Sequence, residues 1–317
     1  MTALMRYLLK KSALLLPVFL GVSIMAFALG VMSPGDPVDQ MLNPNGNESY
    51  SQEEYEEAAA RMGLDKPICV QYANWLNQLL HGDLGRSFFT NKSIMEQLSR
   101  RIPISARLAA LSMIFTILFG VGFGVWMAVY KDRMPDHILS LCSTTALSVP
   151  GFWIAIILIY WFAERWKLLP TSGITSPAGY LLPSITLALP SIGVCARLTR
   201  SSILDEIGRQ YVTVALSKGL SRRQVVMCHA FANALIPVVT YLGTHMAGIL
   251  GGASVVETVF AIPGVGSYAI LAVQSRDYYV VQAYVLFSGA VYVVVNVLTD
   301  LFYMAVDPRI RRGGMFK

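Results

Sequence analysis

Six stretches of the chain lack Asp, Glu, Lys and Arg and are long enough to cross a bilayer as a helix, which takes about 20 residues. They are Ser12–Met32, Leu108–Tyr130, Ile138–Ala163, Leu168–Ala196, Ala230–Val256 and Tyr278–Thr299. Hydrophobic residues make up 55% of the 317 residues and charged residues 14%, whereas soluble domains carry about a quarter charged residues. One water-soluble core cannot hold this surplus. The pattern therefore excludes a soluble enzyme and predicts an all-α membrane protein with six transmembrane helices.

Two of these stretches carry additional signals. The fourth contains four prolines, which disfavour a helix interior, so we expect a loop over 168–179 and a helix over about 180–196, shortened or kinked near Pro190. The first stretch follows a basic start, as in a cleaved signal peptide, but its apolar run exceeds the roughly 7–15 residues usual there. We therefore keep it as the first transmembrane helix, in an N-terminal segment over residues 1–32.

The distribution of Lys and Arg predicts the orientation, because short cytoplasmic loops are enriched in these residues. If the N-terminus is cytoplasmic, 15 of them lie inside, and only Arg165, Lys167 and Arg276 lie in the short outer loops. The long segment 33–103 adds six, but a long loop translocates largely regardless of charge. We therefore expect both termini inside, and the net charge of +6 indicates orientation in a lipid bilayer and no nucleic-acid partner.

The segment 33–103 is predicted to form a small extracytoplasmic domain. Residues 52–61 indicate a short helix with acids early and a base late, which suits the helix dipole, and residues 67–80 indicate a second helix. The Asn- and Gly-rich stretch 43–47 is typical of a turn. Ten carboxylates against six basic residues make the segment acidic. This charge is typical of a solvated surface, or of a docking surface for a soluble partner.

The chain carries no recognisable energy source or catalytic set. It has no phosphate-binding G-x-x-x-x-G-K-[ST] loop and no H-E-x-x-H motif, and its four cysteines form no C-x-x-C pair. Ion-coupled transporters use charges inside the membrane, but Glu164, Glu257 and Asp300 lie only at the ends of the stretches. An ion-coupled secondary transporter and a membrane-embedded enzyme are therefore the weaker alternatives. The pattern favours transport driven by a partner that hydrolyses ATP.

The stretch 197–232 is the only long cytoplasmic loop, and it is amphipathic. Residues Arg200–Ile207 could open a helix, and Gly219 could end the next one in the left-handed conformation. Ser221 could then cap a helix that runs to Pro237. Helix, glycine turn and helix would form a rigid knob able to transmit force from a soluble motor. The alternative is a basic amphipathic loop that lies on anionic lipid.

Several motifs occur in an order that resembles one family of transport proteins. They are Y-V-T-V-A-L-S-K-G-L-S from Tyr211, A-N-A-L-I-P from Ala232, G-D-P from Gly35, G-D-L-G-R-S from Gly82, S-V-P-G-F-W from Ser148, F-A-I-P-G-V-G from Phe260 and D-P-R-I-R from Asp307. The series covers essentially the whole chain. It resembles the permeases of binding-protein-dependent ABC importers, specifically their dipeptide, oligopeptide and nickel branch. The wider superfamily places an acidic residue where this chain has Thr213, so the role of that acid has no counterpart here.

The resemblance implies the type I ABC importer permease fold, with a core over residues 104–317 that includes the coupling loop 197–232. It implies a bacterial inner membrane, a second homologous permease subunit, two cytoplasmic ATP-binding subunits and an extracytoplasmic substrate-binding protein. The chain itself would catalyse no reaction and need no cofactor. The expected contacts with the ATPase are Thr213, Ala215, Lys218, Gly219, Leu220 and Ser221.

Glycines mark two further features. The pairs Gly120-x-x-x-Gly124 and Gly248-x-x-x-Gly252 would permit close helix approach. At the outer end of the fifth stretch, residues 260–266 have turn chemistry. This turn is a candidate re-entrant gate, which would need shelter from lipid, or a plain surface turn. The candidate gate residues are Pro263, Gly264 and Gly266.

His245 lies in the middle of the fifth stretch and is the residue from which we predict the transported solute. An imidazole is costly in a bilayer unless it meets a polar partner or water, and a neutral imidazole suits Ni(II). His245 also resembles the histidine at the matching place in nickel permeases. We therefore expect nickel or a nickel chelate as cargo, with His245 as a metal ligand and Glu257 beside it on the substrate pathway. The alternatives are a di- or oligopeptide cargo and a histidine that only hydrogen-bonds between helices.

Overall fold

The chain is helical throughout the part that the structure describes. A computed structural model covers residues 3–32, 36–43, 49–225 and 231–306 in describable detail. Across these ranges there is no β-strand, only one isolated bridge between Arg86 and Ser93. The predicted all-α fold class is therefore confirmed for these residues.

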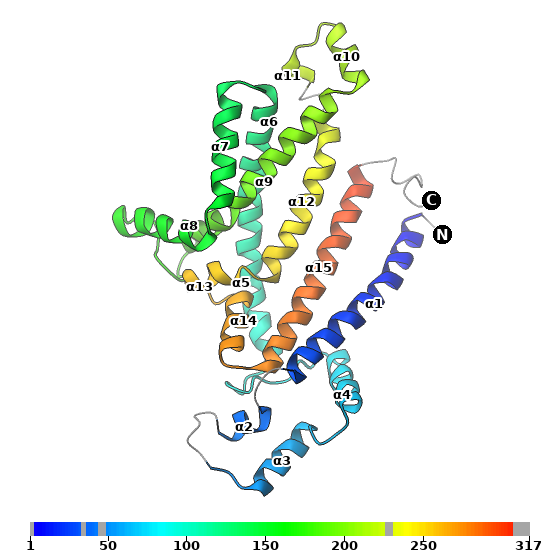
Figure 1. The fold of residues 1–317 in the computed structure, drawn as a ribbon, viewed down its shortest axis with the longest axis vertical. Helices are drawn as coiled ribbons and strands as arrows, with labels where there is room; N and C mark the ends of the chain where they lie inside the picture. The colour runs from blue at the N-terminus through cyan, green and yellow to red at the C-terminus, as the bar shows by residue number, and fades with distance from the viewer. Residues whose placement is uncertain (1–2, 33–35, 44–48, 226–230, 307–317) are drawn as a thin grey trace. The chain divides into compact units, whose positions relative to one another are not determined.

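The helices form two compact units. One unit comprises residues 1–103 and 265–290, and the other comprises residues 104–264 and 291–317. Two helices, α5 (Ile94–Phe115) and α15 (Tyr278–Val306), contribute residues to both units (Figure 1). The functional division expected from the sequence, into residues 1–32, 33–103 and 104–317, stays a prediction.

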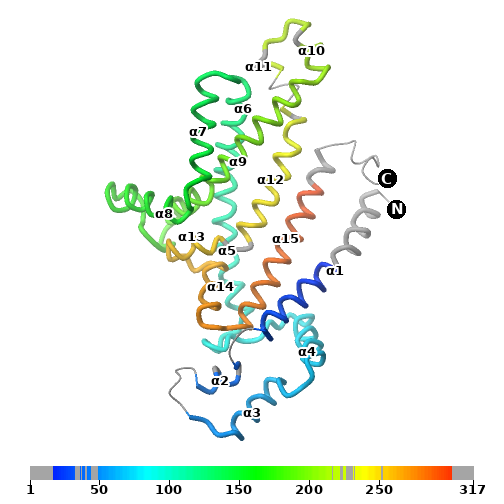
Figure 2. The backbone as a smooth tube through the Cα atoms, viewed as in Figure 1, coloured from blue at the N-terminus to red at the C-terminus, as the bar shows by residue number. Residues whose placement is uncertain are grey.

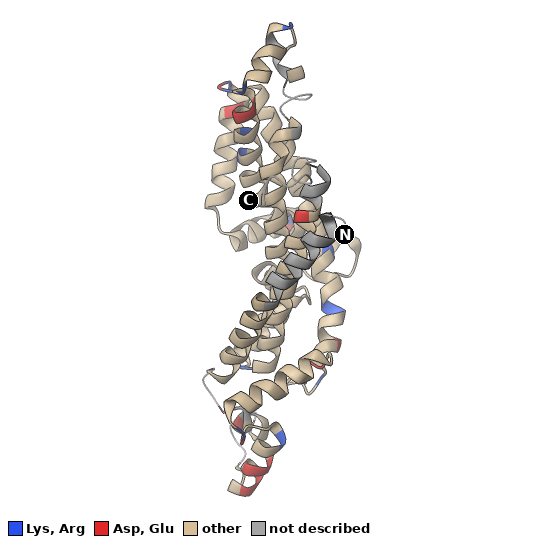
Figure 3. Ribbon diagram, turned by 90° about the vertical axis from the view of Figure 1, so that its right-hand side faces the viewer, with Lys and Arg blue, Asp and Glu red and all other residues tan. Residues whose placement is uncertain are grey.

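The first unit contains the helices predicted for the acidic segment. Its other helices are α1 (Ala3–Val31), α2 (Pro37–Leu42), α3 (Gln52–Met62), α4 (Ile68–Leu80) and α14 (Val265–Gln274). Both predicted helices, over 52–61 and 67–80, are thus confirmed as α3 and α4. Figure 3 shows the glutamates of α3 in red on its ribbon. Of the turn predicted over 43–47, residues 44–47 lie outside the described residues.

Local capping signals fix the ends of α3. Ser51 Oγ accepts a hydrogen bond from the Glu54 amide, and the Glu54 carboxylate accepts one from the Ser51 amide, which forms a capping box. Gly63 ends the helix in the left-handed conformation with φ of +69°. Before the helix, the Tyr50 hydroxyl donates to Asp39 Oδ1 over 2.7 Å, and this bond raises the pKa of Tyr50 to about 12. The bond ties α2 to the start of α3.

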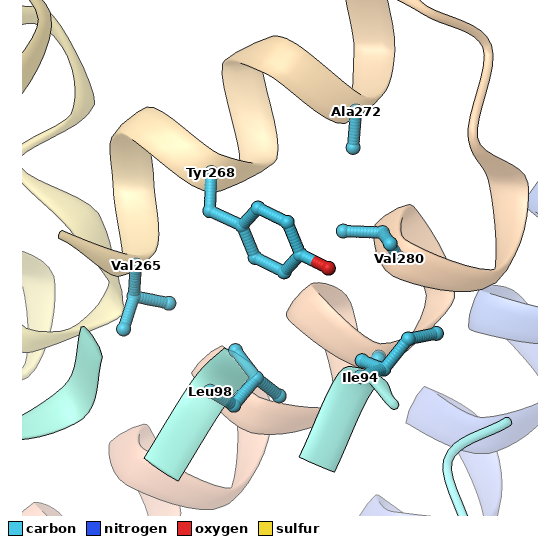
Figure 4. Packing of buried hydrophobic residues seen from close by; sticks show 7 residues of the cluster. Ile94, Leu98, Val265, Tyr268, Ala272 and Val280 are labelled. Atoms are coloured by element: carbon cyan, nitrogen blue, oxygen red, sulfur yellow. The ribbon is translucent and has the colours of Figure 1, made fainter. Parts of the chain in front are cut away.

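A small apolar core joins three helices of the first unit, α5, α14 and α15 (Figure 4). The start of α5 meets α14 and the start of α15 there, through Ile94, Leu98, Val265, Tyr268, Ala272, Val280 and Ala283. The Arg101 guanidinium lies 4.5 Å from the centre of the Tyr268 ring, a cation–π arrangement. Buried apolar area and one cation–π contact therefore join segments more than 160 residues apart in sequence.

The second unit is organised around one long helix, α9 (Leu181–Ile207). This helix packs against η1 (Thr116–Val121), α6 (Gly122–Val129), α7 (Met134–Ser148) and α12 (Phe231–Gly252). The remaining elements near it are α8 (Gly151–Leu158), η2 (Ile159–Arg165), η3 (Pro177–Tyr180) and α13 (Ser254–Val259). The N-terminal part of α9 packs near α8, η2 and α13, and its C-terminal part packs against α6 and α12.

Four helices among the described residues are long and apolar enough to span a membrane, at 94–129, 177–207, 233–250 and 278–301. A fifth span is present if α7 and the helix over 151–165 count together, but these two are bent by 104° (Figure 2). The stretch 138–163 is therefore two helices with a sharp bend between them, and its crossing of the membrane as one span stays a prediction. Val149 is extended because Pro150 follows it and sterically disfavours the helical conformation. The count of six spans stays a prediction.

Several helices extend beyond the apolar stretches that predicted them. The helix expected from Leu108 begins at Ile94, and α9 continues through Pro190 to Ile207, although its end was predicted near Ala196. The interpretation of Arg200–Ile207 as the opening of a new helix is wrong, because these residues form the last turns of α9. Hydropathy marks where a helix meets lipid, and a helix does not have to end at that boundary.

The first predicted glycine pair lies at a tight helix crossing. A Cβ on Gly124 would lie 2.5 Å from Thr199 Cβ and 2.6 Å from the Ala196 carbonyl oxygen, and one on Gly120 would lie 2.7 Å from Cys195 Cβ. Both glycines therefore let η1 and α6 approach α9 closely, as predicted. Gly248 differs, because a Cβ there would meet nothing within 4 Å among the described residues. Within the described residues, Gly248 therefore does not lie at a close helix crossing.

We expect Gly124→Ala to lower the free energy of unfolding by about 1–3 kcal/mol, because the added methyl group overpacks the crossing with α9. Thermal unfolding of the purified protein in detergent micelles would measure this loss. Gly122→Ala is the matched control, since a Cβ two residues earlier meets nothing within 4 Å. An equal loss for both variants would contradict a specific close approach.

Candidate functional site

The stretch after α9 folds into a compact projection, the knob, formed by residues 208–225. Its first helix, α10 (Gln210–Ser217), ends before Gly219, whose φ is +84°. The Leu220 amide donates back to the Ala215 carbonyl over 3.4 Å, as in a Schellman C-cap. The predicted helix-ending role of Gly219 is confirmed, because a residue with a Cβ is strained at this positive φ.

The second helix of the knob begins with a capping box. The Gln224 amide donates to Ser221 Oγ over 3.3 Å, and the Ser221 amide donates to Gln224 Oε1 over 2.9 Å. Ser221 therefore caps α11 (Arg222–Val225), as predicted. The middle of the helix predicted to run on to Pro237, residues 226–230, lies outside the described residues, and α12 includes Phe231 and Pro237.

A miniature apolar core gives the knob its shape. Val212, Ala215 and Val225 are buried together, with Leu220 and Ile207 packed against them. Two of the residues predicted to contact the ATPase, Ala215 and Leu220, are therefore inner packing residues. The other four stand at the exposed surface: Thr213, Lys218, Gly219 and Ser221. The large side chains of Tyr211 and Val214 are also exposed there, and the sequence-based list missed them.

Polar contacts tie the knob to the helices on either side. The Tyr211 hydroxyl donates to Glu206 Oε2 over 2.8 Å, and Asn233 Nδ2 donates to the Tyr211 oxygen over 3.3 Å. Arg209 Nε lies 2.9 Å from Glu206 Oε1. Burial raises the pKa of Tyr211, so the phenol keeps the proton that it donates. The start of α10 is thus linked to the end of α9 and to the start of α12.

His245 lies on α12 beside a hollow of about 390 Å³. The hollow is lined by Leu187, Tyr241, Thr244, His245, Gly248, Ile249 and Ala253. The Tyr241 ring stacks on the imidazole with centroids 5.7 Å apart, and His245 Nδ1 lies 3.5 Å from Ser191 Oγ. His245 Nε2 is covered and has no hydrogen-bond partner among the described residues. The imidazole thus has one weak polar contact, to α9.

The exposed face of α12 carries no charged side chain and includes three polar ones, those of Asn233, Thr240 and Thr244. One residue per helical turn stands on it, and the set is Asn233, Pro237, Thr240, Thr244 and Gly248. We call this set the α12 polar face. A surface that meets lipid is apolar, whereas a surface that meets water or a partner subunit can carry such residues. The α12 polar face therefore suits a transport pathway better than a lipid boundary.

Glu257 is fully buried under the turn that was the candidate gate. The Ser105 hydroxyl donates to Glu257 Oε1 over 2.7 Å, and the Ile262 amide donates to the Glu257 carbonyl over 2.7 Å. A Cβ on Gly264 would lie only 2.2 Å from Glu257 Cδ, so this glycine is required by the close approach of the carboxylate. Contact between Glu257 and cargo, which stays a prediction, would require this turn to open.

The turn alternates between buried and exposed residues in the second unit. Phe260 and Ile262 are buried, and Ala261 between them adopts a φ of +51°. Pro263 is exposed, and Gly266 lies in the first turn of α14. The turn is thus partly buried, with Ala261 and Pro263 exposed, and the alternative of a plain surface turn over 260–266 stays open. The role of these residues as a gate stays a prediction.

The described residues contain no group of three or more His, Cys, Asp or Glu side chains placed to share a metal ion. His245 is accompanied by hydroxyl groups and an aromatic ring, which are poor ligands for a divalent transition metal. Within the described ranges, His245 is therefore part of no such group, and its role as a metal ligand stays a prediction.

Comparisons with known proteins agree on one family. Residues 120–312 match the family described as binding-protein-dependent transport system inner membrane component, and residues 4–109 match its N-terminal family. Among relatives, the chain is 38% identical to a Brucella abortus protein named "Putative peptide transport system permease protein", over 98% of this chain and 99% of the relative. It is 34% identical to the dipeptide transport system permease protein of Escherichia coli, over 97% and 99%. It is 35% identical to the glutathione transport system permease protein of Salmonella choleraesuis, over the same shares.

A solved structure shares the fold. An inward-facing structure of the MetNI methionine ABC transporter aligns with a TM-score of 0.58 and 15% identity, over 67% of this chain and 97% of that chain. Permeases of this kind reside in the inner membrane, cross it several times and work with substrate-binding and ATP-binding partners, so this chain is no enzyme. The chain belongs to the family of binding-protein-dependent transport system inner membrane components, the permease subunits of ABC importers.

Proposed function

We propose that the chain forms half of the pore of an ATP-driven importer for di- or oligopeptides. The observation that carries the cargo class is that the relatives it matches nearly end to end are named for peptide, dipeptide and glutathione transport. The sequence alone favoured nickel because of His245. The peptide alternative now has the better support, because these relatives are named for peptide, dipeptide and glutathione transport and not for nickel.

The α12 polar face supports the proposed peptide pathway. A peptide presents amide N–H and carbonyl groups whatever its side chains are, and the exposed Asn233, Thr240 and Thr244 carry groups that can exchange hydrogen bonds with them. An uncharged polar wall binds such cargo weakly, which allows cargo to pass. We assign His245 to the hollow beside this wall, where its imidazole packs on Tyr241, with specificity left to the substrate-binding protein.

The knob is our candidate for the contact with the ATP-binding subunits. Its capped ends and small apolar core make it a preformed shape, and Thr213, Lys218 and Ser221 lie at its surface. A homologous permease subunit would supply the other half of the pore and two cytoplasmic subunits would supply ATP hydrolysis. The 15 Lys and Arg residues on the knob side of the predicted topology support a cytoplasmic location for the knob and both termini.

The turn over 260–264 is our candidate for a gate at the outer end of the pathway. Glu257 and Gly264 are in contact beneath it, so the turn is closed over a carboxylate. A polar group inside a membrane protein is stable only when its hydrogen bonds are satisfied internally. The turn can therefore hold a defined closed position, with Pro263 at its exposed tip.

Peptide uptake tests the proposed cargo. In proteoliposomes that contain the chain with its partner subunits and binding protein, we expect a labelled dipeptide to accumulate only when ATP is present. Excess unlabelled peptide should suppress this uptake, and free Ni²⁺ should leave it unchanged. ATP-dependent accumulation of labelled nickel that peptide does not suppress would restore the nickel interpretation.

Gly219→Leu tests the knob. At a φ of +84° a side chain costs about 1–2 kcal/mol, so we expect the turn to rearrange and peptide uptake per ATP hydrolysed to fall. Uptake and ATPase activity would be measured in the same vesicles. Gly63→Leu is the matched control, because Gly63 has a similar φ of +69° at the end of α3, outside the knob. Coupling that is unchanged in the Gly219 variant would refute this role.

A double-mutant cycle tests the turn. Gly264→Ala should destabilise the protein because its methyl group collides with the Glu257 carboxylate, and Glu257→Ala removes that carboxylate. We therefore expect the double variant to be more stable than the sum of the two losses predicts, by about 0.5–3 kcal/mol. Thermal unfolding in detergent gives all four values. Strictly additive losses would mean that the two residues do not meet.

A further inference from the structure

A bidentate ion pair joins the first turn of α7 to the C-terminal part of α9. Arg200 Nε donates to Asp136 Oδ1 over 2.7 Å, and Arg200 Nη2 donates to Asp136 Oδ2 over 2.7 Å. The Asp136 side chain is only 3% exposed and that of Arg200 is 29% exposed. Two parallel bonds fix the relative orientation of the two groups as well as their distance.

The same carboxylate also holds the turn between α6 and α7. The Asp132 amide donates to Asp136 Oδ2 over 2.9 Å, and Asp132 adopts a φ of +61°, which is uncommon for a residue with a side chain. The Arg133 amide closes the turn on the Tyr130 carbonyl over 3.0 Å. Asp136 therefore accepts three hydrogen bonds and connects the α6–α7 turn to α9.

A continuous set of contacts leads from this ion pair to the knob. One turn beyond Arg200, Ile203 is buried with Ala128 of α6 and Ala234 of α12, and Ile207 packs against them. Ile207 packs at the same time against the apolar core of the knob. The last turns of α9 are thus held by the ion pair towards α7 and by apolar contacts towards α6 and α12, directly before the knob begins.

We propose that Asp136 and Arg200 are positioning residues that make the α6–α7 turn move together with α9 when the knob is displaced. The proposal rests on the proposed contact between the knob and an ATP-binding subunit. Apolar contacts such as those of Ile203 are non-directional, so they set the distance between two helices more than their relative orientation. A bidentate ion pair with a fixed fork sets that orientation as well. A displacement of the knob would therefore reach α7 as well as α9, so that this part of the second unit moves as one body (Figure 1).

The decisive quantity is the amount of peptide imported per ATP hydrolysed. A residue that only stabilises the fold changes how much functional protein is present, so uptake and hydrolysis fall together and their ratio stays constant. A residue that transmits motion changes the ratio itself. For Asp136→Asn, which keeps the size of the side chain but loses its charge, we expect the ratio to fall about fivefold or more.

Arg200→Lys is the second variant and keeps the charge. Lysine offers a point charge and cannot form the two parallel bonds, so we expect a smaller fall in the same ratio. The exchanged pair Asp136→Arg with Arg200→Asp should recover part of the coupling. Lys131→Gln is the matched control, because this exposed lysine belongs to the same turn but only approaches Asp132 at 3.9 Å. Its ratio should equal that of the wild type.

The assay uses the complete transporter in proteoliposomes, with uptake of a labelled dipeptide and release of inorganic phosphate measured in the same vesicles. Wild-type uptake that does not depend on ATP would refute the proposed function. Wild-type coupling together with unchanged ratios in Asp136→Asn and Arg200→Lys would refute the ion-pair proposal alone. A fall in the ratio for the control Lys131→Gln equal to that of Asp136→Asn would also overturn it, because the effect would then belong to the turn and not to the ion pair.

Discussion

The close packing of helices against α9 is the constraint on which the second unit depends. Gly120 and Gly124 bring η1 and α6 so near to α9 that a single added Cβ would collide with its backbone or side chains. Van der Waals contact is the main attraction available between helices in lipid, and it requires such short separations. Because α9 is continuous over 27 residues, or about 40 Å, this packing also fixes the direction in which its end leaves the bundle.

The knob depends on α9 in a further way. Its buried core consists of Val212, Ala215 and Val225, which is far too small to sustain an independent fold. Its shape comes from local signals, the glycine C-cap at Gly219 and the capping box at Ser221, and its position comes from Glu206 and Ile207 at the end of α9. A projection built this way is rigid where it joins α9, which is what transmission of force requires.

Features that depend on near neighbours in the sequence were predictable, whereas contacts between distant segments were not. The roles of Gly219 and Ser221, and the helices over 52–61 and 67–80, follow from hydrogen bonds between near neighbours. Pro150 is a local signal for the end of α7, but the apolar stretch 138–163 continues past it and predicted a single helix. The burial of Glu257 and the pairing of Asp136 with Arg200 join residues 152 and 64 positions distant from their partners, so no spacing in the sequence could indicate them.

The proposed cargo rests on the names of the relatives, and the surroundings of His245 are compatible with it. A nickel site needs several ligands around one point, whereas His245 has a tyrosine ring and a serine hydroxyl as its neighbours. A peptide pathway needs a surface that is polar enough to replace water around amide groups, yet uncharged, so that neither a cationic nor an anionic side chain is held. The α12 polar face has no charge and carries such polar groups at Asn233, Thr240 and Thr244. Such a wall would discriminate little between peptides, which leaves selection to the binding protein and only passage to the pore.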